Sequence, residues 1–323
     1  MTSPKKACAT VLLCGATWLL PRLGSAEDTA PPNRPATAEA GSTPLAPPPV
    51  DEATLIAKLR STSEAEAVAA ARKLVEIKTP TVQAALYDAL ALGVPPKVAA
   101  AALTALAAQR SAESLPVLEL YTHHRNPDLR KRATQGLAAL VVAPDETDAT
   151  PRPPVAGKKP VKVAAKAPTI PHEELAPKVV PALIAALSDG SAEVRGVAAE
   201  ALGKRREKSA ESALIKLLLR KDSAAPEALG QIGGPDTARA LGEMTGTVPN
   251  YLITQTLGAL IRRADFGPEP VRTEVVKMLG KMPGAEPVDI LTDYVKATET
   301  DKETKARPSR AEAQKIIEQR TAK

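Results

Sequence analysis

The chain has 323 residues, of which 44% are apolar but only 2% are aromatic, and its formal net charge is +6. This composition argues against one large core of aromatic side chains and favours closely spaced helices held together by alanine and leucine contacts. The two cysteines, Cys8 and Cys14, lie so near the start that they exclude a disulfide framework in the rest of the chain.

Residues 1–26 have the pattern of a secretory signal peptide. Lys5 and Lys6 precede the apolar run ACATVLLCGATWLL, which a small-residue Gly-Ser-Ala site follows. The apolar run is shorter than the roughly 20 residues that span a bilayer as a helix. We therefore expect cleavage before Glu27, a periplasmic or secreted protein, and no transmembrane helix in the mature chain.

Two segments differ in composition from their surroundings. Residues 27–50 are rich in proline and alanine with almost no large apolar residue, as in a disordered spacer. Residues 143–172 contain many prolines and lysines without a sustained period, which indicates a linker or a looped-out insertion. We expect helical repeats over 51–142 and 173–299, and a charged tail over 300–323 whose helix either caps the array or frays.

Apolar residues recur at helical spacing along both blocks, and Asp51 and Ser63 stand at expected N-cap positions. In the first block the expected helix pairs are 51–60 with 63–77, 81–93 with 96–109, and 112–122 with 126–142. In the second block they are 180–187 with 194–202, 210–220 with 228–234, 237–246 with 250–263, and 270–281 with 287–298. A final helix is expected over 309–319.

The hairpin of residues 181–204 shows how such pairs must assemble. Its two helices are joined by a Ser-Asp-Gly-Ser turn, and each carries one apolar stripe. A pair of helices cannot bury both stripes alone, so it needs neighbours of the same kind. The sequence therefore predicts an all-α fold, an α-solenoid of about six to seven stacked antiparallel helix pairs. We favour one continuous stack; the alternative is two three-repeat blocks that move relative to one another.

The second helix of this hairpin opens with Val194-Arg195 and continues through Ala198 to Leu202, and the turn before it carries Asp189. In these residues the chain resembles the HEAT repeat family, in the short form also found in phycobilin-lyase-related proteins. The resemblance implies an armadillo-like helical scaffold, and by itself it carries no chromophore chemistry.

A copy of the pattern lies 65 residues earlier in the chain. A gapless shift places Arg130, Ala133 and Leu137 over Arg195, Ala198 and Leu202. The repeated arginine predicts a shared structural role, such as pairing with a turn acid or a helix-end carbonyl. His124 stands where the later repeat has Asp189, so we expect a polar ladder through the turns to be interrupted there.

The resemblance also implies where a partner binds, because the second helices of HEAT-like stacks line the concave surface. Lys131 and Arg132 correspond to Gly196 and Val197, so positive charge is added in one repeat only, and Gln135 follows on the same helix. These three residues form either a partner-binding patch or a solvated helix face.

Residue types that carry chemistry are sparse. The three histidines have no i, i+4 pair, which argues against a metal site, and Glu173-Glu174 fits the favourable first turn of a helix. We expect Gly230, Gly233 and Gly234 to form a helix C-cap rather than a phosphate loop. The sequence thus predicts no catalytic, cofactor-binding or metal-ligating residue, no cofactor, and no enzyme activity.

We expect an exported HEAT-repeat scaffold that binds a protein partner in the bacterial cell envelope. One alternative is a pigment- or cofactor-handling, lyase-like HEAT protein. Another is a nucleic-acid or polyanion binder that uses the basic linker. Specific nucleic-acid binding is not expected, because the linker has no interleaved aromatic residues on which bases could stack.

Overall fold

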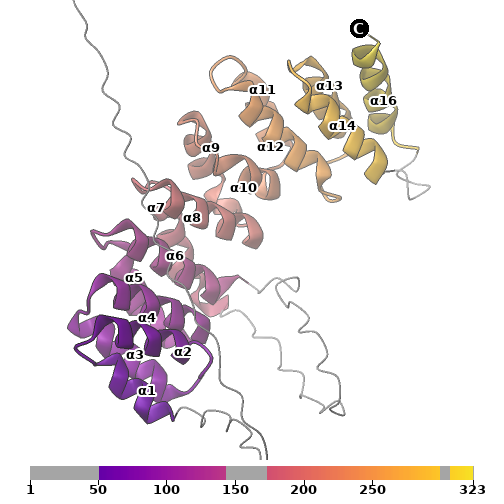
Figure 1. Cartoon of the computed structure of the whole chain (residues 1–323). Coiled ribbons are helices and arrows are strands. Elements are labelled where there is room, and N and C mark those ends of the chain that lie inside the picture. Colours follow the sequence, from indigo (N-terminus) through magenta and orange to yellow (C-terminus); the bar gives the residue numbers. More distant parts are fainter. Residues whose placement is uncertain (1–50, 143–172, 299–305, 323) are drawn as a thin grey trace, which may run out of the picture. The chain divides into compact units, whose positions relative to one another are not determined.

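The computed structural model describes residues 51–142, 173–298 and 306–322, and these residues form α-helices and short 3₁₀ turns (Figure 1). The expected signal peptide, the spacer and the linker lie outside the described residues. In the first block the helices are α1 Glu52–Leu59, α2 Glu64–Leu74, α3 Pro80–Leu92, α4 Pro96–Gln109, α5 Leu115–Thr122 and α6 Pro127–Val141.

In the second block the helices are α7 Ala176–Ala186, α8 Ala192–Arg205, α9 Glu211–Leu219, α10 Ala225–Ile232, α11 Pro235–Glu243, α12 Asn250–Arg262, α13 Glu269–Lys281 and α14 Glu286–Ala297. Helix α16, Pro308–Thr321, follows. Short 3₁₀ turns precede α5, α7 and α9: η1 Ala112–Ser114, η3 Glu173–Leu175 and η4 Lys208–Ala210.

Local sequence sets many of the helix starts. Ser63 and Thr79 accept hydrogen bonds from the backbone N–H groups of Glu66 and Val82, which satisfies donors that would otherwise have no partner. Asp51 occupies the N-cap position of α1, but its side chain makes no capping hydrogen bond. Prolines often stand in the first turn, as Pro80 does in α3, where the missing N–H costs nothing.

Within the described residues the helices form consecutive pairs, from α1 with α2 to α13 with α14, which confirms the predicted all-α solenoid. The second helix of each pair also packs against the second helix of the next pair, in the row α2, α4, α6, α8, α10, α12 and α14. This row passes from α6 to α8, so the repeats on either side of the linker are in contact.

The core consists of leucine, alanine and valine at equivalent positions of successive repeats. Leu118 and Leu183 are buried on first helices, as are Leu137 and Leu202 on second helices. Small alanines between the leucines let neighbouring helices approach closely. The last helix, α16, packs against α13 and α14 and buries Ala313, so it covers the end of the row rather than fraying.

Gly230 lies inside α10, so the predicted C-cap role for it was wrong. A Cβ built on Gly230 would lie 2.1 Å from the Cβ of Ala259 and 3.1 Å from its backbone, because α12 crosses α10 at this point. Gly233 does occupy the C-cap of α10, whereas Gly234 is the N-cap of α11. The contact between the helices, and not backbone conformation, requires glycine at position 230.

This contact gives a matched pair of substitutions. Gly230→Ala should lower the free energy of unfolding by about 1–3 kcal/mol, because α10 and α12 must separate to admit the methyl group. Gly196→Ala, in α8, should instead raise it by about 0.5–1 kcal/mol, since nothing lies within 4 Å of the new Cβ and alanine favours the helix. Urea unfolding of both variants tests the pair, and equal effects would contradict the packing of α10 on α12.

Arg205 holds the two ends of the segment that joins α6 to η3. Its Nη1 donates to the backbone oxygen of Val141 at 3.1 Å and to Glu173 Oε2 at 2.8 Å. One side chain therefore spans the distance between the end of α6 and the start of η3. Elsewhere in the fold the corresponding connections are short, as from α8 to η4.

Replacing residues 144–171 by a four-residue glycine-serine loop should therefore leave the fold intact. We expect the free energy of unfolding to stay unchanged or to rise by about 1 kcal/mol, because closing a shorter loop costs less entropy. Thermal and urea melts measure this. A loss of more than about 2 kcal/mol would mean that the replaced segment packs on the repeats.

Candidate functional site

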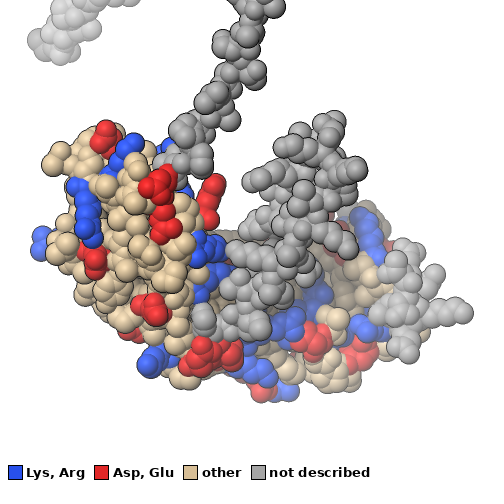
Figure 2. Space-filling view, turned by 90° about the horizontal axis from the view of Figure 1, so that it is seen from below, with Lys and Arg blue, Asp and Glu red and all other residues tan. Residues whose placement is uncertain are grey.

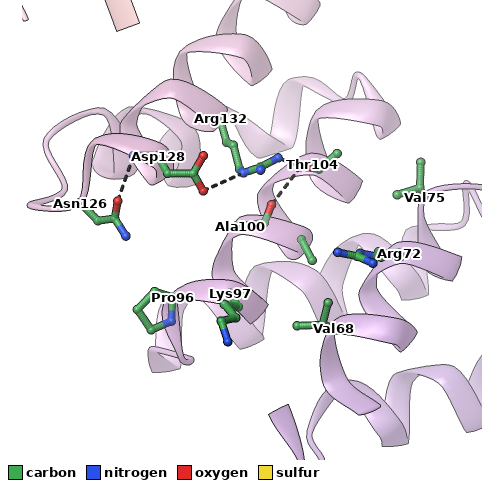
Figure 3. A pocket seen from close by; sticks show the side chains of 11 residues that line it. Val68, Arg72, Val75, Pro96, Lys97, Ala100, Thr104, Asn126, Asp128 and Arg132 are labelled. Carbon is green, nitrogen blue, oxygen red and sulfur yellow. Dashed lines mark hydrogen bonds and ion pairs between the residues drawn. The ribbon is translucent and has the colours of Figure 1, made fainter. Parts of the chain in front are cut away.

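A groove crosses three consecutive second helices, α2, α4 and α6 (Figure 3). Its volume is about 370 Å³. We call it the second-helix groove, and its lining residues are Val68, Arg72, Val75, Pro96, Lys97, Ala100, Ala101, Thr104, Asn126, Asp128 and Arg132. Because the groove crosses repeats one to three, no single repeat contains it.

The floor of the groove follows from the small residues of α4. Ala100 is buried and Ala101 half-buried, so this stretch of α4 fills little space between its neighbours. Val68 of α2 and Val75, the C-cap residue of α2, are half-buried beside it and supply apolar surface. A larger residue at position 101, such as the Arg132 that stands at the equivalent place in α6, would occupy the groove.

The groove carries three basic residues and one acidic residue. Arg132 of α6 donates from Nε to Asp128 Oδ2 at 3.2 Å and from Nη1 to Thr104 Oγ1 at 2.9 Å. Lys97 lies 3.1 Å from Glu64 Oε1, with 82% of its side chain exposed. Arg72 is exposed, and no side chain in the described part of the chain pairs with it. The cations thus flank an apolar floor.

The three residues predicted to bind a partner separate in the structure. Arg132 lines the groove, and Gln135 is exposed one turn further along α6. Lys131 points to the next repeat instead, where its Nζ lies 2.8 Å from Glu193 Oε2. Arg72 and Lys97 were not predicted, because they lie outside the two repeats that the 65-residue shift compares and their neighbours across the helices could not be read from the sequence.

The repeated arginines have matching partners. Arg130 Nε and Nη2 donate to the two carboxylate oxygens of Asp189, at 2.7 and 2.8 Å, and Nη1 donates to the backbone oxygen of His124. Arg195 Nε donates to Asp222 at 2.6 Å, and Nη1 to the backbone oxygen of Asp189. Each arginine thus joins its own turn to the turn of the next repeat.

The other repeat positions lie in the core. Val194, Ala133, Ala198, Leu137 and Leu202 are all buried. They position the arginine ladder because Arg130 and Arg195 project from the turn end of the same two helices.

The ladder stops at the ends of this two-repeat stretch. Before it, Ala99 stands in α4 where the later repeats have arginine, and His124 stacks on Tyr121 with ring centroids 5.6 Å apart. After it, α10 begins at Ala225, beyond Asp222, so the shortened helix has no place for the arginine. The ladder therefore binds repeats three, four and five to one another.

The ion pair between Arg130 and Asp189 also changes proton affinity. The hydrogen bonds from Arg130 hold the pKa of the Asp189 carboxyl below its usual value, against the opposing effect of burial, and the backbone N–H of Ser191 adds to the effect. The same hydrogen bonds raise the pKa of Arg130. The pair therefore stays ionised in the folded protein through the whole neutral range.

A second hollow, of about 410 Å³, lies beside the start of α11 and the segment after α12. Arg263 donates to the backbone oxygens of Gly230 and Gly233 and to Asp265, which Arg206 also contacts. The hydrogen bond from Arg263 lowers the pKa of Asp265 to about 2. Over the whole lining, the three basic residues Arg206, Lys208 and Arg263 are balanced by the three acidic residues Glu211, Asp236 and Asp265, so this hollow has no excess of charge to offer a ligand, unlike the second-helix groove.

Neither a cluster of metal-binding side chains nor a membrane-spanning helix was found in the described part of the chain. In the ranges 51–142, 173–298 and 306–322, no three histidine, cysteine or acidic residues gather closely enough to hold a metal ion. His123 is exposed and His124 half-buried, while His172 lies outside the described residues. None of the helices in those ranges is both long and apolar enough to cross a membrane.

The sequence from residue 180 to 262, which covers most of α7 and continues to the end of α12, matches the model of the HEAT repeats family. Residues 180–262 therefore contain HEAT repeats. The matched residues include Arg195 and Asp222 of the ladder, and the Arg130 pair extends the same geometry to the repeat before the matched stretch. A comparison with curated proteins finds no match.

Several solved helical-repeat structures resemble the HEAT repeats of this chain. The complex of CpcE and CpcF of phycocyanin lyase from Nostoc sp. PCC7120 is 17% identical, with 90% of this chain and 99% of that chain covered and a TM-score of 0.40. A designed armadillo repeat protein is 16% identical, with 83% and 99% covered and a TM-score of 0.32. Kap121p is 14% identical, with 82% and 29% covered and a TM-score of 0.39. At these scores the resemblances say nothing about a ligand or partner.

Proposed function

We propose that this protein is an exported, non-enzymatic HEAT-repeat scaffold that binds a protein partner through the second-helix groove. The observation that carries the proposal is the groove itself, where exposed, incompletely paired cations flank an apolar floor on three successive second helices. Protein interfaces combine such apolar floors with polar rims, and arginine is enriched in them.

Charge on the rest of the surface is more evenly mixed. On the face that Figure 2 shows, lysine and arginine are interspersed with aspartate and glutamate. On second helices beyond the groove, several exposed charges pair within the fold, as Lys204 does with Glu200 and Arg262 with Glu227. A partner is therefore expected to be selected locally at the groove rather than by a broad field of one sign.

Partner capture from a bacterial envelope extract tests the binding role. Immobilised mature chain should retain a partner, and Arg132→Glu should reduce its recovery, with an unfolding free energy within about 1 kcal/mol of wild type because the residue is partly exposed. The matched control is Lys216→Glu, an exposed lysine on α9 outside the groove. Equal recovery on all three baits would remove the groove from the binding site.

The export part of the proposal rests on residues 1–26 and has its own test. Mass spectrometry of the native protein should find an N-terminus at Glu27. An intact Met1 in a cytoplasmic fraction would overturn export, and a diacyl group on Cys14 would replace it with a lipoprotein. Absorbance of the purified native protein in the visible range would favour the pigment-handling alternative over a bare scaffold.

A further inference from the structure

We infer that the element recognised by the second-helix groove is an extended acidic peptide segment, with two carboxylates that straddle a small apolar residue. The inference deepens the proposed function and rests on it. It names the chemistry of the partner segment, which follows from the charges that the groove leaves unsatisfied.

The two rims of the groove are the side of α2, with Arg72, and the side of α6, with Arg132, and each rim carries N–H donors that have no acceptor in the described residues. Arg72 of α2 has no partner among the described side chains, so its whole guanidinium is available to an acceptor. Arg132 of α6 uses Nε and Nη1 for Asp128 and Thr104, which leaves Nη2 open and holds the guanidinium in place. A carboxylate that binds Nη2 therefore meets a donor whose side-chain entropy is already reduced.

The sum of charges favours an anion. Arg72, Lys97 and Arg132 line the groove, against Asp128 alone. Lys97 has one contact, with Glu64, and remains largely exposed. A basic segment would meet repulsion from Arg72 and Arg132, and a neutral segment would leave the Arg72 guanidinium and Nη2 of Arg132 without an acceptor.

The floor between the rims limits what lies between the carboxylates. Ala100 and Ala101 of α4 form its centre and Val68 borders it, so its surface is apolar and offers little hydrogen bonding. A small apolar side chain fits there, whereas a charged one would be desolvated without a partner.

The separation of the rims sets the spacing in the partner. Alanine-lined helices pack at interaxial distances of about 8 Å, so α2 and α6, on either side of α4, are about 16 Å apart. An extended chain advances about 3.3 Å per residue and alternate side chains face the same side, so two carboxylates that both face the groove stand four residues apart, about 13 Å, and the length of their side chains covers the rest. The groove runs across the helices, so an extended segment along it can reach Arg72 with one carboxylate and Arg132 with the other.

Fluorescence polarisation with synthetic peptides tests the inference on the mature chain. The probe is a labelled twelve-residue serine-threonine-valine peptide with two glutamates four positions apart around a central alanine. It should bind, and affinity should fall as sodium chloride is raised. Moving both glutamates to one end of the peptide should weaken binding by about tenfold, because only one rim can then be reached.

Charge reversal gives the decisive arm. The double variant Arg72→Glu with Arg132→Glu should bind the acidic probe with an affinity lower by on the order of tenfold or more. It should also bind a version of the probe in which lysine replaces glutamate. The gain for the lysine probe cannot arise from misfolding. Lys216→Glu with Lys277→Glu, two exposed lysines outside the groove, is the control with the same change of charge and should leave both affinities unchanged.

Failure of this inference and failure of the proposed function give different results. Equal affinity for glutamate and lysine probes, or no effect of the double reversal at the groove, would overturn the acidic segment. If the same double variant still loses the envelope partner, the groove remains the binding site with another chemistry. Undiminished capture of the partner by that variant would overturn the groove itself.

Discussion

Leu202→Ala is expected to lower the free energy of unfolding by about 2–5 kcal/mol, the range for truncating a fully buried leucine. The side chain of Leu202 is entirely buried in α8, where second helices α6 and α10 pack on either side. Each repeat of a solenoid is stabilised mainly by its neighbours, so a cavity at this position weakens two interfaces together. Leu137→Ala, at the equivalent buried position of α6, should have a similar effect.

Urea unfolding followed by circular dichroism measures these losses. Lys158→Ala and Lys162→Ala, in the basic linker, are the comparison and should change stability by less than about 0.5 kcal/mol. Losses at the linker lysines equal to those at the leucines would contradict the equivalence of Leu137 and Leu202 as buried repeat positions.

Asp189→Ala is expected to cost about 3 kcal/mol at neutral pH. The variant leaves Arg130 with only backbone oxygens as partners, and removing one member of a buried ion pair costs more than the intact pair contributes. We expect the lower end of the usual range because 18% of the Arg130 side chain and 12% of the Asp189 side chain stay exposed. The pair joins α6 to the turn before α8, so its loss weakens the contact across the linker.

The pH dependence of this loss follows from the lowered pKa of Asp189. A carboxyl group whose folded pKa lies below its unfolded value of about 3.9 stabilises the protein fully above that value and ceases to do so as the pH falls through the folded pKa. The difference in stability between wild type and Asp189→Ala should therefore be largest near pH 7 and shrink below about pH 4. A difference that grows on acidification would contradict the ionised pair.

The predicted helix pairs agree with the structure because the signals for them are local. Helical spacing of apolar residues, proline in first turns and the 65-residue repeat all act within or between adjacent helices. The predicted C-cap role of Gly230 failed for the opposite reason. Ala259, which requires glycine there, is 29 positions away in the sequence, and only the crossing of α10 by α12 brings the two together.

The candidate site was predictable in part. Unequal charge between equivalent repeats singled out Lys131 and Arg132, and the structure divides them: Lys131 pairs with Glu193 while Arg132 lines the groove. Arg72 had no such signal, because it lies outside the two repeats that the 65-residue shift compares.

The sequence by itself therefore determined the fold class, the helix pairs and the buried face of each helix, because burial in a solenoid repeats with the local apolar period. The tertiary structure alone decided which charges are satisfied. Arg130 and Asp189 are 59 positions apart, and Arg72 and Arg132 lie on helices of different repeats. Pairing and exposure depend on how side chains meet across stacked helices, and a periodic sequence leaves that undetermined until the register of each contact is known.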